Sequence, residues 1–272
     1  MKPVRINLAL QGGGAHGAFT WGVLDRLLDE AHIEVEGITA TSAGAMNAAV
    51  FKAGLIAGGR KGARKALETF WNNLSGTGSL VPEPLRDWFA TMAPPLSVVS
   101  DLARLSPAYQ MGDILARSFS PYDTNPLDYH PLRSVIDALD FECVCSDQGP
   151  ALFIAATNVR SGKVRVFQGD EIDTDAILAS ACLPTLYQAV EKFDPQTGRV
   201  EAFWDGGYMG NPALFPLFHN TTSRDILIVN INPLERDEVP VLPSEIQNRI
   251  NEISFNSSLL RELRAIEFVQ RL

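Results

Sequence analysis

The chain has 272 residues, of which 46% are apolar and 20% charged, a balance typical of a globular protein with a sizeable core. Its net charge of −9 argues against nucleic acid as a partner and against electrostatic docking on an anionic membrane, because both need clustered Lys and Arg. The apolar run that ends at Leu10 is too short for a signal peptide, and no stretch approaches the roughly 18 apolar residues of a membrane span, so we expect a cytoplasmic protein.

The first part of the chain alternates strand and helix patterns. Alternating apolar residues predict a strand over 4–10, and a glycine-rich stretch follows it directly. Helical spacing then predicts a helix over 17–31, and a second strand over 34–41 leads into a helix over 43–55. This repeat predicts an α/β fold with a mostly parallel central sheet and right-handed crossovers.

Residues from about 76 to 132 break that rhythm, since eight of the 17 prolines fall there. We interpret this segment as an insertion of short helices and loops over the sheet. It forms either a lid or wall at an active site or a purely structural helical excursion.

Regular patterns resume in the second half of the chain. They predict strands over 151–159 and 163–167, a helix over 172–183 and strands over 200–204 and 225–231. The Ser161-Gly162 pair provides a turn between the first two strands, and Pro184 stops the helix.

The last predicted helix, over 244–272, carries an apolar stripe and no cap at its end. The stripe packs on the protein's own core or forms a partner surface, and the natural chain could continue past Leu272. Of the three cysteines, Cys143 and Cys145 lack the spacing of a metal or redox pair, so we predict ordinary strand packing for them.

The stretch Gly12-Gly13-Gly14-Ala15-His16-Gly17 follows the first strand directly. Consecutive glycines leave backbone N–H groups unshielded, and at a helix N-terminus these groups can bind an anion. The same spacing matches a dinucleotide fingerprint, with Glu34 and Glu36 near the position of the ribose-binding acid, but the second strand ends in Thr41-Ser42 instead. A phosphate loop is excluded because no Gly-Lys-Ser/Thr is present.

The stretch Ala40-Thr41-Ser42-Ala43-Gly44 lies between the second strand and the following helix. A tight strand-to-helix turn pushes a serine Oγ outward at a helix N-terminus, which is the arrangement of a nucleophile elbow. Small neighbours are needed because the backbone passes close by. Ala40 stands where the usual pattern has glycine, which is a mild departure.

A serine nucleophile needs a base. Only His130 and His219 follow Ser42, and only His219 follows Asp205, so a Ser–His–Asp triad is disfavoured. Asp205 is the better candidate, because it ends a predicted strand and precedes Gly206-Gly207 at what should be the same sheet edge as Ser42. Taken alone, Asp-Gly-Gly is an ordinary turn.

Together with Ala179-Ser180-Ala181-Cys182-Leu183-Pro184, these motifs resemble the patatin-like phospholipase family over about residues 4–215. The resemblance implies one three-layer α/β/α domain over 1–272 and a Ser42–Asp205 dyad without histidine. It also implies an oxyanion hole of N–H groups from Gly12, Gly13, Gly14 and Ala15, supported by the remaining small residues of the motifs. It implies hydrolysis of lipid or other acyl esters through an acyl-enzyme, without metal or cofactor.

One departure from the family affects the substrate. The family usually has Arg or Lys where this chain has His16, so a preference for phospholipids is in doubt, and His16 either supports the loop or assists proton transfer. The alternatives are an acyltransferase or a hydroxyacyl-polyester hydrolase with the same dyad, and a non-catalytic lipid-binding module. A local patch could give transient contact with a lipid surface.

Overall fold

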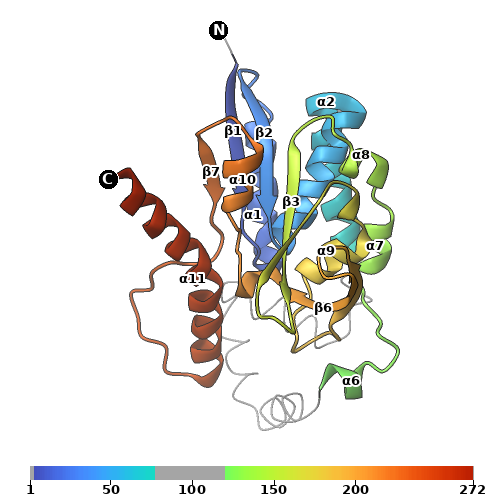
Figure 1. The fold of residues 1–272 in the computed structure, drawn as a ribbon, viewed down its shortest axis with the longest axis vertical. Coiled ribbons are helices and arrows are strands. Elements are labelled where there is room, and N and C mark those ends of the chain that lie inside the picture. Colours follow the sequence, from blue (N-terminus) through green and yellow to red (C-terminus); the bar gives the residue numbers. More distant parts are fainter. Residues whose placement is uncertain (1–2, 77–119, 272) are drawn as a thin grey trace.

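A seven-stranded sheet forms the centre of the computed structural model, which describes residues 3–76 and 120–271 (Figure 1). The strands are β1 (Val4–Leu10), β2 (Ile33–Ala40), β3 (Ala151–Asn158), β4 (Val164–Gln168), β5 (Val190–Asp194), β6 (Arg199–Asp205) and β7 (Ile226–Val229). The helices are α1 (Gly17–Leu27), α2 (Ala43–Gly76), α6 (Pro121–Thr124), α7 (Arg133–Asp137), α8 (Phe141–Cys145), α9 (Thr174–Ser180), α10 (Phe215–Asn220) and α11 (Pro243–Gln270). Short 3-10 helices occur at η1 (Gly14–His16), η3 (Gly169–Glu171) and η4 (Gly206–Tyr208).

The strands β7, β1, β2 and β3 are adjacent and parallel. The strands β4 and β6 both pair with β3 in the antiparallel direction, and β5 pairs with β6 in the same way. The predicted α/β class with a mostly parallel central sheet is therefore confirmed. The predicted turn at Ser161-Gly162 implied the β3–β4 pair, whereas the antiparallel pairing of β6 with β3 and of β5 with β6 was not predicted.

Helices cover both faces of the sheet. Alternate residues of β1 point to opposite faces, so Leu8 and Leu10 join the main core beneath α1, α2 and α9, while Ala9 packs with Leu214 and Leu259 on the side of α10 and α11. All five of these side chains are at most 2% exposed. The predicted three-layer α/β/α arrangement is confirmed.

Two predicted elements differ in the structure. The helix predicted over 43–55 extends to Gly76 as α2, with a kink where Gly58 and Gly59 leave helical geometry. The cysteines predicted to pack in a strand lie in the short helix α8 instead, whose first turn is capped by the Asp140 side chain accepting from the N–H of Cys143. A three-residue Cys-Val-Cys pattern is too short to distinguish the two-residue repeat of a strand from the 3.6-residue repeat of a helix. The Asp140 cap favours the helix.

The strand β5 was missed by the sequence analysis. Its alternating sequence Val190-Glu191-Lys192-Phe193-Asp194 is short and mostly polar, and within the described strands it pairs with β6 alone.

Most of the predicted insertion, from 77 to 119, lies outside the described residues, so its predicted role is not tested. Within the described ranges, no helix is long and apolar enough to cross a membrane.

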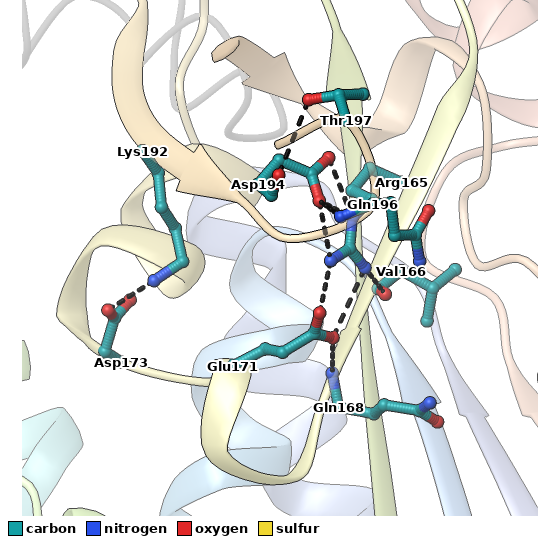
Figure 2. Close-up of polar contacts among 9 residues, drawn as sticks. All are labelled: Arg165, Val166, Gln168, Glu171, Asp173, Lys192, Asp194, Gln196 and Thr197. Atoms are coloured by element: carbon teal, nitrogen blue, oxygen red, sulfur yellow. Dashed lines mark hydrogen bonds and ion pairs between the residues drawn. The ribbon is translucent and has the colours of Figure 1, made fainter. Parts of the chain in front are cut away.

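A buried ion cluster stabilises the antiparallel side of the sheet (Figure 2). The Nε of Arg165 donates to both carboxylate oxygens of Asp194 at 3.1 Å, and its terminal nitrogens reach Glu171 and the carbonyl of Val166. The guanidinium lies 4.8 Å from the centre of the Phe167 ring. Arg165 and Asp194 are 4% and 2% exposed, so the two charges depend on each other.

Replacing Arg165 with methionine should therefore lower the free energy of unfolding by about 3–5 kcal/mol, because Asp194 is left as an uncompensated buried charge. Urea denaturation of the folded protein measures this change. The control is Arg133→Ala, whose ion pair with Asp175 is 46% and 40% exposed and should contribute at most about 1 kcal/mol. Equal effects of the two substitutions would contradict a stabilising role for the cluster.

Candidate active site

The glycine loop and the serine turn lie side by side because of the strand register. The last residue of β1, Leu10, pairs with the last residue of β2, Ala40, so the segments that follow them leave the sheet at the same level. Gly12 is packed against this turn, since a Cβ placed on it would lie 2.7 Å from the Cβ of Ser42. The structure thus brings together the first two motifs identified in the sequence.

The third motif, Asp205-Gly206-Gly207, lies beside the serine turn because β6 and β2 both pair with β3. Ala40 pairs with Ile154 of β3, and Asp205 pairs with Ala156 only two residues further along, while β4 occupies the opposite edge of that strand. Two residues of a strand span about 7 Å. Because β6 runs antiparallel to β3, its end meets the end of β2, and Asp205 faces the turn that carries Ser42.

The backbone of Ser42 has a strained conformation of the kind that a nucleophile elbow requires. Its φ of 53° lies in the left-handed region, which non-glycine residues rarely occupy. The turn is fixed by a relay of hydrogen bonds, in which the N–H of Ser42 donates to the Oγ of Ser180 at 2.8 Å and that hydroxyl donates to the carbonyl of Ala155 at 2.6 Å. Ser180 was part of a motif in the sequence, but its role was not predicted.

Asp205 is held in place by its backbone and carries an unusual pKa. Its carbonyl accepts from the hydroxyl of Thr157 at 2.8 Å, and its Oδ1 accepts from the N–H of Gly207 at 2.7 Å. Burial raises the pKa of Asp205 to about 7, against the lowering effect of the hydrogen bonds from Gly207 and the Ser42 side chain. A carboxyl with a pKa near neutrality, facing a serine side chain, suits a general base.

Close backbone approaches explain two of the small residues in these motifs. A Cβ on Gly44 would lie 2.3 Å from the carbonyl oxygen of Leu10, and one on Gly206 would lie 2.2 Å from that of Ala155. Larger side chains would therefore push the serine turn away from β1 and the aspartate turn away from β3. Ala40, in place of the usual glycine, is fully buried at the end of β2.

The structure narrows the predicted set of oxyanion donors. The N–H of Gly12 donates to the Oδ1 of Asn211 at 2.7 Å, so its inclusion in the oxyanion hole is corrected. The N–H groups of Gly13, Gly14 and Ala15 donate to no acceptor among the described residues. They lie at η1, directly before α1, and Gly17 is the first residue of that helix.

His16 occupies the position where a permanent cation was expected from the family. Burial lowers the pKa of its imidazole, against the raising effects of the nearby Gly13 backbone and of the charge of Glu252. This lowered pKa favours the neutral form of the imidazole. Its Nδ1 is buried and has no hydrogen-bond partner within the described part of the chain.

An apolar cavity of about 30 Å³ adjoins Ser42 and Gly14. This volume holds about one water molecule, so an acyl chain would have to displace lining side chains. The other lining residues come from α2, the segment before α7 and the segment after α9: Ala43, Met46, Phe70, Trp71, Leu74, Leu132, Ala181, Leu183 and Tyr187.

The remaining candidates of the sequence analysis lie elsewhere. His219 is exposed on α10, and no hydrogen bond among the described residues joins it to Ser42 or Asp205. His130 is buried against the ring of Tyr187, and burial lowers its pKa to about 4. Within the described residues, no three His, Cys, Asp or Glu side chains gather closely enough to hold a metal ion.

A larger hollow, of about 430 Å³, lies at the opposite end of the sheet, beside the first residues of β1 and β2. Its Arg60 donates to the carbonyls of Leu27, Leu28 and Ile33. Its Glu36 accepts from Thr222 and Ser223. Both of these charged groups already bind backbone groups of the protein. They therefore do not form a second catalytic arrangement like that of Ser42 and Asp205.

Comparisons with known proteins identify the family of the chain. A family model described as patatin-like phospholipase matches residues 8–218. A search of curated proteins finds no match. Among solved structures, VipD from Legionella pneumophila is similar at 17% identity with a TM-score of 0.43, covering 83% of this chain and 49% of VipD.

The heterodimeric ExoU–SpcU complex from the type III secretion system of Pseudomonas aeruginosa is similar at 15% identity with a TM-score of 0.27. That match covers 97% of this chain and 52% of the other, so the chain spans about half the length of both structures. The family model covers most of the chain, from β1 through the serine and aspartate motifs to α10, and the protein therefore belongs to the patatin-like phospholipase family.

Proposed function

We propose that this protein is a lipid acyl hydrolase that cleaves carboxylic esters through a Ser42–Asp205 dyad. The observation that carries the proposal is the pairing of the two side chains. Ser42 lies on a left-handed turn, and its side chain is near enough to the buried carboxyl of Asp205 to lower that carboxyl's pKa, which still stands at about 7 and lets Asp205 accept a proton near neutral pH. A non-catalytic lipid-binding module has no need of this arrangement.

In the first half of the reaction, the Oγ of Ser42 attacks the ester carbonyl while Asp205 takes the hydroxyl proton. The carbonyl oxygen becomes an oxyanion, which the N–H groups of Gly13 and Gly14, with Ala15, stabilise in this proposal. Collapse of the tetrahedral intermediate breaks the ester C–O bond. Asp205 returns the proton to the departing alcohol, and the acyl group stays on Ser42.

In the second half, Asp205 takes a proton from a water molecule that attacks the acyl-enzyme. The resulting intermediate collapses, the carboxylic acid leaves, and the proton returns to the Oγ of Ser42. No metal or cofactor is required for any step. If an alcohol replaces the water, the same residues catalyse acyl transfer.

The apolar lining beside Ser42 favours a hydrocarbon acyl group over a polar one. His16 adds no fixed positive charge near neutral pH, so the loop offers little attraction to an anionic head group. We therefore propose neutral or zwitterionic acyl esters as preferred substrates.

Labelling with a fluorophosphonate tests the nucleophile. The native protein should form one covalent adduct, located on Ser42 by peptide mass spectrometry, because phosphonylation needs an activated serine. Heat-denatured protein is the control and should not react. An adduct elsewhere, or none in the native protein, would overturn the assignment.

Hydrolysis of acyl esters that differ in chain length and head group tests the substrate class. We expect turnover of neutral and zwitterionic lipid esters, with weaker turnover of anionic ones. Adding alcohols separates hydrolysis from acyl transfer, because a transferase gives a new ester as its main product. Comparable assays with hydroxyacyl polyesters identify the polyester alternative.

A further inference from the structure

Four side-chain amides surround the start of the glycine loop, where Gln11 leads into Gly12. All are buried, with at most 4% of each residue exposed. They come from four distant segments of the chain: Gln11, Asn211, Asn232 and Asn256. Buried amides must find hydrogen-bond partners, so their contacts identify what they hold.

Both polar groups of Gly12 are bound by these amides. Its carbonyl oxygen accepts from the Nδ2 of Asn232 at 2.7 Å and from the Nδ2 of Asn211 at 3.3 Å. Its N–H donates to the Oδ1 of Asn211 at 2.7 Å. The first residue of the loop is thus fixed by side chains from outside the loop.

Asn256 of α11 holds the segment that carries Asn232. The Oε1 of Gln11 accepts from the backbone N–H groups of Ile231 and Asn232, both at 2.8 Å, so its amide nitrogen faces the other way. That nitrogen donates to the Oδ1 of Asn256 at 2.7 Å, and the Nδ2 of Asn256 donates to the carbonyl of Pro233 at 3.1 Å. In Figure 1, α11 lies at the side of the sheet, below β7 in this view.

The geometry of the peptide bond links these contacts to the candidate oxyanion hole. A trans peptide is planar, so the C=O of Gly12 and the N–H of Gly13 belong to one plane and point in opposite directions. Fixing the carbonyl of Gly12 therefore fixes the direction of the Gly13 N–H. Glycine has little intrinsic preference to hold that direction by itself.

We propose that Asn232, supported by Asn256, is a positioning residue that directs the N–H of Gly13 toward the reacting carbonyl oxygen. This inference rests on the proposed ester hydrolysis at Ser42. Both asparagines lie outside residues 8–218, the part that matches the family model. Two later parts of the chain, α11 and the segment that follows β7, thus complete a site whose motifs all lie earlier in the sequence.

The test compares an oxoester with the matching thionoester in the full chain and in Asn232→Leu. Sulfur accepts hydrogen bonds weakly, so a thionoester gains little from an oxyanion hole. Asn232→Leu should lower kcat for the oxoester by about ten- to a hundredfold with little change in KM. The thionoester rate should fall much less, so the oxo-to-thiono ratio drops by about tenfold.

The control is Asn251→Leu on α11, whose side chain accepts from Gln247 and makes no hydrogen bond to the glycine loop among the described residues, and it should keep both rates. If Asn232→Leu fails to fold, Asn256→Leu is measured in the same way, with an expected drop in the ratio of about threefold. A kcat that is unchanged, or that falls equally for both esters, would overturn the positioning role while Ser42-dependent hydrolysis by the wild type still stands. A wild type without that hydrolysis would overturn the proposed function, and this inference with it.

Discussion

Replacing Ser42 with alanine is expected to lower kcat for ester hydrolysis by about 10³-fold or more while the protein stays folded. The substitution removes the attacking oxygen and leaves the elbow, Asp205 and the glycine loop in place. Initial rates with a p-nitrophenyl ester measure the loss of activity. Circular dichroism and thermal unfolding show whether the variant stays folded. Ser161→Ala, in the exposed turn between β3 and β4, is the control and should keep full activity.

The backbone of Ser42 gives this prediction a second part. Alanine at the φ of 53° keeps the strain of a left-handed residue, whereas glycine adopts that conformation freely. Ser42→Gly should therefore be as inactive as Ser42→Ala but more stable by about 0.5–1 kcal/mol, after allowing for the greater freedom of glycine in the unfolded chain. Hydrolysis that survives in both variants would show that another residue is the nucleophile.

The motifs could be located from the sequence because each one is local. Each motif spans at most six residues. They are a glycine run after a strand, a serine before a helix and an aspartate at the end of a strand. The meeting of the glycine run and the serine in space was also predictable, since the carboxyl ends of parallel strands such as β1 and β2 share one edge. The end-to-end placement of β2 and β6 along β3, which brings Asp205 to Ser42, could not be predicted because it depends on antiparallel register.

The parts that sequence reasoning missed depend on contacts between distant residues. Asn232 and Asn256 reach Gly12 and Gln11 across separations of 220 and 245 residues, and an isolated asparagine carries no local signal of such a role. The correction at Gly12 has the same origin, because its N–H is bound by a side chain 199 residues away. Ser180 stood in a recognisable motif, but its relay from Ser42 to Ala155 appears only in three dimensions.

Replacing Asp205 with asparagine is expected to abolish hydrolysis and to stabilise the protein at alkaline pH. Asparagine cannot take the proton of Ser42, so kcat should fall by about 10³-fold or more. In the wild type, kcat/KM should rise with pH through about 7, as Asp205 loses its proton and becomes a base. A rate that does not change between pH 5 and 9 would argue against Asp205 as the base.

The stability effect follows from the raised pKa. Between pH 3.8 and about 7, the folded protein keeps a proton on Asp205 that the unfolded chain has lost, so stability falls as pH rises through this window. Above pH 7 the loss is complete, and about three pKa units correspond to roughly 4 kcal/mol. Asparagine does not titrate, and its Oδ1 can still accept from the N–H of Gly207.

Asp205→Asn should therefore match the wild type in stability near pH 4 and exceed it by on the order of 3–4 kcal/mol at pH 8. Urea unfolding at both pH values measures the difference. The control is Asp175→Asn, an exposed carboxylate paired with Arg133, which should change stability by less than about 0.5 kcal/mol at either pH. A variant that is inactive but gains no stability at pH 8 would show that Asp205 is ionised in the folded protein at much lower pH. A gain in stability together with loss of activity would mean that burial of this carboxyl, which makes it a base near neutral pH, costs the fold stability.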